Sequence, residues 1–227
     1  MTTPKSLLVV HSSARQNRSH TRELAHQFTE TWTTHGGGRV VERDVGLTPP
    51  SFINEEWIGA AFTDPEMLTT DQSNLLSESD ALIDEVKAAD VIVLGVPMYN
   101  YSMPASLKAW FDLIARVGVT FSFDLERGDT PIEPILSGKK LVVLSSRGEF
   151  DFASGGTRAH LNGLDPALAA CAHYLGAKAS EMDTIAIEYE EFKDNRWEAS
   201  RDSAITKTIF SARLLANFEG PVTEVSG

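Results

Sequence analysis

The stretch from Val91 to Val96 is the most apolar part of the chain. Apolar and polar side chains do not alternate in it, which predicts a strand buried on both faces, as in parallel sheets that are covered by helices. Residues 7–10 and 141–144 form similar apolar runs. A chain that contains several such strands is expected to fold as an α/β protein.

Patterns typical of helices separate these runs. Leu24, Phe28 and Trp32, for example, recur at the spacing of one helix face. Further helices are predicted around residues 75–86, 104–117, 165–175 and 197–218, and two weaker strands at 40–45 and 184–187. Five strand–helix units joined by right-handed crossovers predict a three-layer, doubly wound sheet of five parallel strands.

The organisation of the chain predicts one domain over residues 1–227, because no repeat, low-complexity tract or linker divides it. Pro49 and Pro50 open a mixed segment that lacks a clear helical or strand period. We therefore expect a long loop insertion with little regular structure over residues 47–70. An insertion of this length is expected to serve a substrate site or an interface.

The charge balance argues against polyanionic partners. Twenty Lys and Arg stand against 32 Asp and Glu, a net charge of -12, which disfavours nucleic acid and anionic membranes. Cys171 is the single cysteine, so no internal disulfide or cysteine-based zinc site is expected, and no other metal site is predicted. The apolar run at residues 7–10 is too short for a signal peptide or a membrane span. We expect a cytoplasmic protein that binds a small molecule.

In sheets of this type, ligands bind at the carboxyl ends of the strands, here the loops 11–19, 97–103 and 145–156. The first loop contains no glycine, so it matches neither the dinucleotide fingerprint nor the Walker A loop. Its Ser13 and Ser19 precede a predicted helix, whose N-terminus favours an anion such as a phosphate.

Two alternative interpretations of the first loop stay open. Ser19 can act only as the helix cap, since serine is a preferred N-cap residue. Arg15 and Arg18 add positive charge to the loop, but both can equally be solvated surface side chains. A response-regulator receiver is excluded, because it needs acidic residues at the end of the first strand, where this chain has His11 and Ser12.

The second and third loops offer what a flat heteroaromatic ring requires. Tyr99, Asn100 and Tyr101 combine aromatic faces with polar edges, and Gly148 allows close approach of the backbone. The tyrosines can also serve ordinary loop packing, and the third loop by itself is a weak signal. Together with a phosphate-binding first loop, the three loops describe a site for flavin mononucleotide (FMN).

Residues 97–101 and 107–121 resemble the signature region of the FMN-dependent NADH-azoreductases, in the group of flavodoxin-like NAD(P)H:quinone oxidoreductases. The Ser12–Ser13 and Ser19–Thr21 segments and residues 138–140 and 145–148 support the resemblance, which spans roughly residues 5–187. It implies a flavodoxin-like fold, one FMN in each subunit and a homodimer with the flavin site at the subunit interface. Position 149 departs from the pattern, because family members often have a second glycine where this chain has Glu149.

The resemblance also implies roles for individual residues. The implied flavin-binding set is Ser13, Ser19, His20 and Thr21 at the phosphate, Pro97, Met98, Tyr99, Asn100 and Tyr101 at the isoalloxazine, and Ser146, Arg147, Gly148 and Glu149 on its pyrimidine side. Phe121 and Phe123 would help to line the substrate pocket.

The implied reaction is a two-electron, ping-pong transfer from NADH or NADPH to a quinone or azo compound. A hydride passes to flavin N5, and the electrons leave for the acceptor once the oxidised nicotinamide has departed, so no catalytic side chain is required. Two alternative functions would use the same FMN site: a flavodoxin-type electron carrier and a non-catalytic flavin redox sensor. Rapid reduction by NADH would distinguish the enzyme from both.

Overall fold

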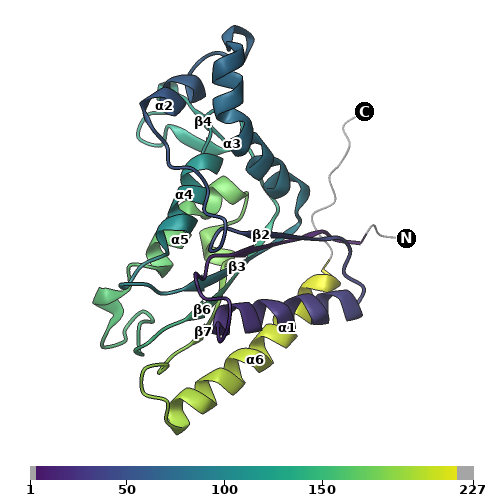
Figure 1. The fold of residues 1–227 in the computed structure, drawn as a ribbon, viewed down its shortest axis with the longest axis vertical. Coiled ribbons are helices and arrows are strands. Elements are labelled where there is room, and N and C mark those ends of the chain that lie inside the picture. The colour runs from purple at the N-terminus through teal and green to yellow at the C-terminus, as the bar shows by residue number, and fades with distance from the viewer. Residues whose placement is uncertain (1–3, 219–227) are drawn as a thin grey trace.

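The computed structural model describes residues 4–218 and contains a five-stranded, all-parallel sheet with the order β2-β1-β3-β6-β7 (Figure 1). Its strands are β1 (Leu7–His11), β2 (Val40–Asp44), β3 (Val91–Pro97), β6 (Lys140–Ser146) and β7 (Asp183–Ile187). This order and the helices on both faces confirm the predicted flavodoxin-like, doubly wound class.

Helices cover both faces of the sheet (Figure 1). The helices α1 (His20–Thr34) and α6 (Asn195–Ala216) lie on one face, where they share a core cluster with strand residues such as Val93. The other face carries α3 (Thr70–Ala88), α4 (Ala105–Ile114) and α5 (Asp165–Cys171), which a 3-10 turn extends over Ala172–Leu175. Every residue of β3 is buried, as the uninterrupted apolar pattern predicts.

The strand register brings the predicted loops to one edge of the sheet. His11 pairs with Gly95, Pro97 with Ser146, and Ser146 with Ile187. The loops that follow β1, β3 and β6 therefore start side by side at the carboxyl edge, although the strands are far apart in the sequence.

The segment 47–70 has more regular structure than the little that the sequence predicts, which corrects one expectation. It contains α2 (Glu55–Ala61) and a 3-10 turn at Pro65–Met67. The Asn54 side chain caps α2 by accepting a hydrogen bond from the Trp57 backbone N–H (2.8 Å), and the buried Trp57 joins the same core cluster as α3 and α4. A single large side chain, with no repeating apolar period, thus anchors the helix.

A second, antiparallel sheet of two strands was not predicted. It pairs β4 (Phe121–Phe123) with β5 (Ile132–Pro134), and a 3-10 turn at Leu125–Arg127 lies between them. Short 3-10 turns also occur at Ala159–Leu161 and Ala179–Glu181. Within residues 4–218, no helix combines the length and the apolar character that crossing a membrane requires.

Candidate functional site

A cleft that is open to solvent lies at the carboxyl edge of the sheet, where ligands bind in folds of this class. All three predicted loops contribute to it. Its lining residues are Ser13, Arg15, Arg18, Ser19, His20, Thr21, Pro97, Met98, Tyr99, Ser146, Gly148, Glu190 and Glu191. We call it the inner cleft.

Most of the predicted flavin-binding residues line the inner cleft, and some do not. Asn100, Tyr101, Arg147 and Glu149 lie outside its lining, as do Phe121 and Phe123. Phe121 is buried with its ring centroid 5.2 Å from that of Tyr174, whereas Phe123 is exposed on the same strand. The roles of these residues toward a flavin or a substrate stay predictions.

The first loop presents hydroxyl groups beside the N-terminus of α1. Ser19 occupies the N-cap position, but its side chain accepts no capping hydrogen bond, and its Oγ lies 3.3 Å from the Thr21 Oγ1. Ser13 is buried, and its Oγ accepts a hydrogen bond from the Arg15 N–H (3.2 Å). Because the Ser19 hydroxyl does not cap the helix, it is available to an anion at the positive end of the helix.

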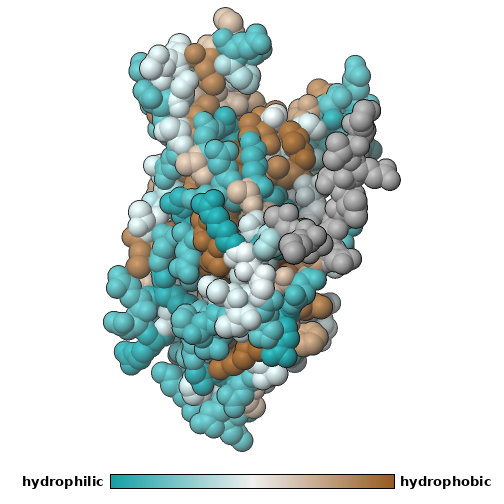
Figure 2. Space-filling model, turned by 90° about the vertical axis from the view of Figure 1, so that its right-hand side faces the viewer, coloured by the Kyte–Doolittle hydropathy of each residue, from teal (hydrophilic) through white to brown (hydrophobic). Residues whose placement is uncertain are grey.

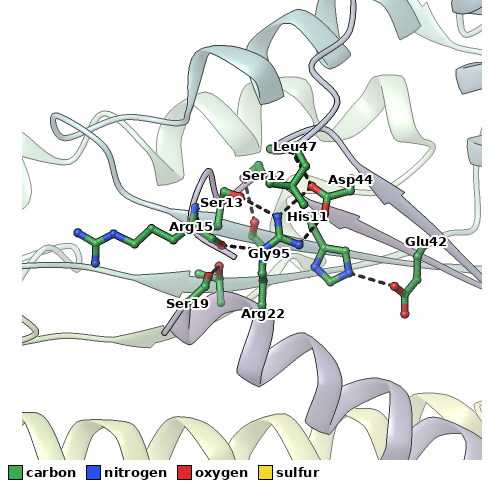
Figure 3. Close-up of polar contacts among 12 residues, drawn as sticks. His11, Ser12, Ser13, Arg15, Ser19, Arg22, Glu42, Asp44, Leu47 and Gly95 are labelled. Atoms are coloured by element: carbon green, nitrogen blue, oxygen red, sulfur yellow. Dashed lines mark hydrogen bonds and ion pairs between the residues drawn. The ribbon is translucent and has the colours of Figure 1, made fainter. Parts of the chain in front are cut away.

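The side chain of Arg22 fixes the shape of this loop (Figure 3). Its Nη2 donates to the Ser13 carbonyl (2.7 Å) and its Nε to the Arg15 carbonyl (2.9 Å), while Nη1 and Nη2 also bind the two carboxylate oxygens of Asp44 at 2.6 and 2.9 Å. The loop carbonyls are thereby engaged by Arg22 on α1. Arg22 is not predictable as a site residue from the sequence, because an arginine in the first turn of a helix resembles a surface residue.

Asp44 connects the same network to the end of β2. Its Oδ1 accepts hydrogen bonds from the N–H groups of Gly46 (3.1 Å) and Leu47 (3.0 Å). Burial alone would raise the pKa of Asp44, but the Arg22 and Leu47 hydrogen bonds hold that pKa below its ordinary value. A Cβ on Gly46 would lie 2.2 Å from the Ser13 carbonyl oxygen, so the first loop rests directly on this glycine.

His11 ends β1 beneath this loop, and its Nε2 lies 3.5 Å from the Glu42 carboxylate (Figure 3). Its Nδ1 is buried and has no hydrogen-bond partner among the described residues. Burial lowers the pKa of His11, and the nearby Glu42 opposes this effect. The position agrees with a structural role at the strand end.

The second loop contains a tight turn with two residues in the left-handed region. Tyr99 and Ser102 exchange backbone hydrogen bonds (2.9 and 3.0 Å), and φ is 49° at Asn100 and 66° at Tyr101. Positive φ at both central positions is typical of a type I′ turn, where asparagine is favoured but tyrosine is unusual. The loop thus holds a costly conformation of the kind that clusters at ligand sites.

Glu149 links the second and third loops. Its carboxylate accepts a hydrogen bond from the Tyr101 hydroxyl (3.2 Å) and lies 3.4 Å from the Arg158 Nε. The residue that departs from the family pattern therefore ties Tyr101 in place.

The Arg147 side chain is not part of the inner-cleft lining. It is 3% exposed, its Nη2 lies 2.7 and 2.9 Å from the Asp165 carboxylate oxygens, and its Nη1 is 3.7 Å from Glu188. Its guanidinium also lies 5.7 Å from the ring centroid of Phe152. The side chain therefore serves the packing of the third loop, and Ser146 and Gly148 on either side of it line the cleft.

Glu190 and Glu191 are two lining residues that sequence analysis did not predict. The Glu191 N–H donates to the Gly148 carbonyl (3.0 Å), and Glu190 lies 3.8 Å from the His20 Nε2. A Cβ at position 148 would lie 2.8 Å from the Glu191 Cγ, so only glycine leaves room here without moving Glu191. No motif in the sequence marks this segment, which follows β7 and reaches the cleft through backbone pairing.

The inner cleft has the features that FMN requires. Uncapped hydroxyls at a helix N-terminus suit a phosphate monoester, and Arg15 and Arg18 offset the acidity of Glu190 and Glu191 in the same lining. Met98 and Tyr99 supply apolar surface for a flat ring, and Gly148 permits a close backbone approach.

Comparison with known proteins shows the family to which the chain belongs. The sequence profile of the family with the flavodoxin-like fold matches residues 5–206. The FMN-dependent NADH:quinone oxidoreductase 2 of Colwellia psychrerythraea is 48% identical over 207 residues, which cover 88% of this chain and 94% of that protein. The chain belongs to the flavodoxin-like family of FMN-dependent NADH:quinone oxidoreductases.

Solved structures agree with the fold of this flavodoxin-like protein. An azoreductase from Bacillus anthracis matches with a TM-score of 0.80 and 22% identity, over 92% of this chain and 99% of that chain. An FMN-dependent NADH-azoreductase from the same species, solved in complex with FMN, matches with a TM-score of 0.78 and 16% identity over 93% and 100% of the two chains. At these identities the likeness concerns the fold alone.

Proposed function

We propose that this protein is an FMN-dependent NAD(P)H:quinone oxidoreductase that also reduces azo compounds. The observation that carries the proposal is the inner cleft, in which the uncapped N-terminus of α1 and two further strand-end loops meet. The names of its relatives, among them the NADH:quinone oxidoreductase of Colwellia psychrerythraea, support the substrate class.

Three groups of residues would hold FMN. The proposed set is Ser13, Ser19, His20 and Thr21 for the phosphate, Pro97, Met98, Tyr99, Asn100 and Tyr101 for the ring, and Ser146, Arg147, Gly148 and Glu149 for its pyrimidine side, with Phe121 and Phe123 toward the substrate. FMN bound there would supply two-electron transfer from NADH or NADPH to the acceptor. Backbone N–H groups of the second and third loops would favour negative charge at the ring edge.

Ping-pong kinetics are expected, because donor and acceptor would occupy the same ring face in turn. The chain itself would bind and orient the substrates and exclude water, with no side chain needed for covalent or acid–base work.

We also propose a homodimer of single-domain subunits, each holding one FMN. Large apolar side chains are exposed on the segment 47–70 and on the β4–β5 hairpin, including Phe62 (73%), Met67 (73%) and Leu125 (75%). Hydrophobic atoms are visible at the upper end of Figure 2, the end that carries α2 and α3 in Figure 1. Exposed apolar surface of this kind marks interfaces. A cytoplasmic location is proposed with it, where NADH and NADPH are available.

Absorbance spectra of the FMN-reconstituted protein test the proposal. Anaerobic NADH or NADPH should bleach the flavin band, and a quinone or azo dye should restore it. Bound flavin that stays oxidised with both donors would instead indicate an electron carrier or a redox sensor. Failure to bind FMN would contradict the assignment of the inner cleft.

A further inference from the structure

A second hollow lies beyond the first loop, between the start of α1 and the start of α6, and we call it the outer groove. Its lining residues are Arg15, Gln16, Asn17, Arg18, Ser19, His20, Arg22, Glu23, Glu190, Lys193, Trp197 and Arg201. Several of them, including Arg18 and Ser19, also line the inner cleft. The two hollows are therefore contiguous through the proposed phosphate site.

The outer groove gathers positive charge on an acidic protein. The chain has a net charge of -12, yet five arginine and lysine side chains meet here against two glutamates, Glu23 and Glu190. Arg22 and Arg201 are paired, with Asp44 and Glu23 respectively.

The remaining three cations of the groove are Arg15, Arg18 and Lys193, and none of them forms an ion pair within residues 4–218. Unpaired cations around a hollow attract an anion.

The backbone places two of these cations in an unusual conformation. Arg18 has a φ of 56° and Lys193 a φ of 50°. Both values lie in the left-handed region, which residues other than glycine and asparagine rarely adopt. Residues held in this region cluster at ligand-binding sites. Here they come from two loops distant in the sequence and line the same groove.

Trp197 adds an aromatic wall to the groove. It is half-buried against the core cluster between α1 and the sheet, and its ring centroid lies 5.7 Å from that of His20. An indole face is a good stacking surface for a flat base, and the flanking cations suit phosphate oxygens.

We propose that the outer groove binds a phosphorylated adenosine, with the phosphate at Arg18 and Lys193 and the purine against Trp197. The inference rests on the proposed function, because it assumes that a flavin phosphate occupies the adjoining loop. Two molecules carry this chemistry: the adenylate half of FAD, which would continue outward from that phosphate, and the adenosine phosphate of a nicotinamide donor.

Titration of the full-length protein with three probes tests the proposal. Flavin-free protein is titrated with FMN and with FAD by fluorescence, and both flavin-free and FMN-loaded protein are titrated with 2′,5′-ADP by calorimetry. The test variant is Lys193→Gln, because Lys193 is exposed and lines the outer groove but not the inner cleft. The matched control is Lys207→Gln, which removes an exposed lysine from α6 away from the groove.

We expect Lys193→Gln to weaken the affinity for a phosphorylated adenosine by about tenfold and to change the affinity for FMN by less than about twofold. Lys207→Gln should change neither affinity. FAD that binds within about tenfold of FMN and responds to Lys193→Gln assigns the groove to the flavin adenylate. A response confined to 2′,5′-ADP assigns it to the donor.

If Lys193→Gln affects neither FAD nor 2′,5′-ADP, the proposal is overturned even where FMN binds normally. If the protein does not bind FMN at all, that result counts against the proposed function. Titration of the flavin-free protein with 2′,5′-ADP still shows whether the outer groove binds a phosphorylated adenosine.

Discussion

The guanidinium of Arg22 and the carboxylate of Asp44 form a two-point ion pair, at 2.6 and 2.9 Å, that joins the first turn of α1 to the end of β2. The same guanidinium holds the carbonyls of Ser13 and Arg15. The planar arginine fork serves both tasks at once, which a lysine ammonium cannot do.

The first prediction follows from this geometry. Arg22→Lys should raise the dissociation constant for FMN by about tenfold, because the loop carbonyls lose charge-assisted hydrogen bonds worth about 1.5 kcal/mol or more each. Flavin fluorescence titration measures the change. Arg43→Lys is the matched control, since Arg43 forms a comparable pair with Glu85 that does not touch the loop. Equal losses in both variants would show that Arg22 acts only through stability.

Gly46 gives a second prediction, based on space alone. In Gly46→Ala the new Cβ would meet the Ser13 carbonyl oxygen at 2.2 Å, so the first loop must move. We expect a loss of about 1–3 kcal/mol in the free energy of unfolding and a weaker affinity for FMN. Gly59→Ala in α2, where the added Cβ meets nothing within 4 Å, should instead stabilise by about 0.5–1 kcal/mol. Urea unfolding of both variants checks the contrast, and normal FMN affinity in Gly46→Ala would contradict it.

Arg147 is expected to act mainly in stability. Arg147→Gln leaves Asp165 and Glu188 without their buried cation and should cost about 3 kcal/mol of unfolding free energy. The exposed pair of Lys178 with Glu181 provides the control, and Lys178→Gln should leave the midpoint of unfolding unchanged. A variant Arg147→Gln that unfolds like the wild type but loses FMN would assign the side chain to the ligand instead.

His11 predicts a dependence of stability on pH. Because burial lowers its pKa in the folded protein, the unfolded chain binds more protons between that pKa and the ordinary value near about 6.5. The contribution of neutral His11 to the free energy of unfolding is therefore fully present above about pH 6.5, and it is lost as the pH falls toward the folded-state pKa. Burial lowers the pKa of His173 as well, so both histidines act in the same direction.

The variant His11→Asn should lose less stability than the wild type between about pH 7.5 and pH 5.5, and urea unfolding at the two pH values measures this. Identical slopes in the two proteins would contradict the role of His11. The variant His26→Asn is a suitable control, because His26 is an exposed residue on α1.

The sequence predicts the central architecture because burial on both faces leaves an unambiguous pattern, as in the strand that ends at Pro97. The site is predictable where it depends on strand ends, and so Ser13, Tyr99 and Gly148 are found in the inner cleft. The helix α2 was not predicted, because seven residues with one large buried side chain show no apolar period.

Other parts of the site depend on contacts that no local pattern encodes. Arg22 reaches Asp44, a residue 22 positions away, and Glu190 and Glu191 arrive at the cleft through backbone pairing beyond β7. Polar residues in such positions are indistinguishable from ordinary surface residues until the strands are placed side by side.

The contact between Gly46 and the Ser13 carbonyl restricts how the protein can diversify. An insertion after the first strand would press on the end of the second, and a side chain at position 46 would do the same from the opposite side. Natural variants and engineered libraries should therefore exchange residues 12–22 and 44–47 as a single cassette, whereas the exposed positions of the segment that follows, outside the buried Trp57 and Ala60, can change independently of it.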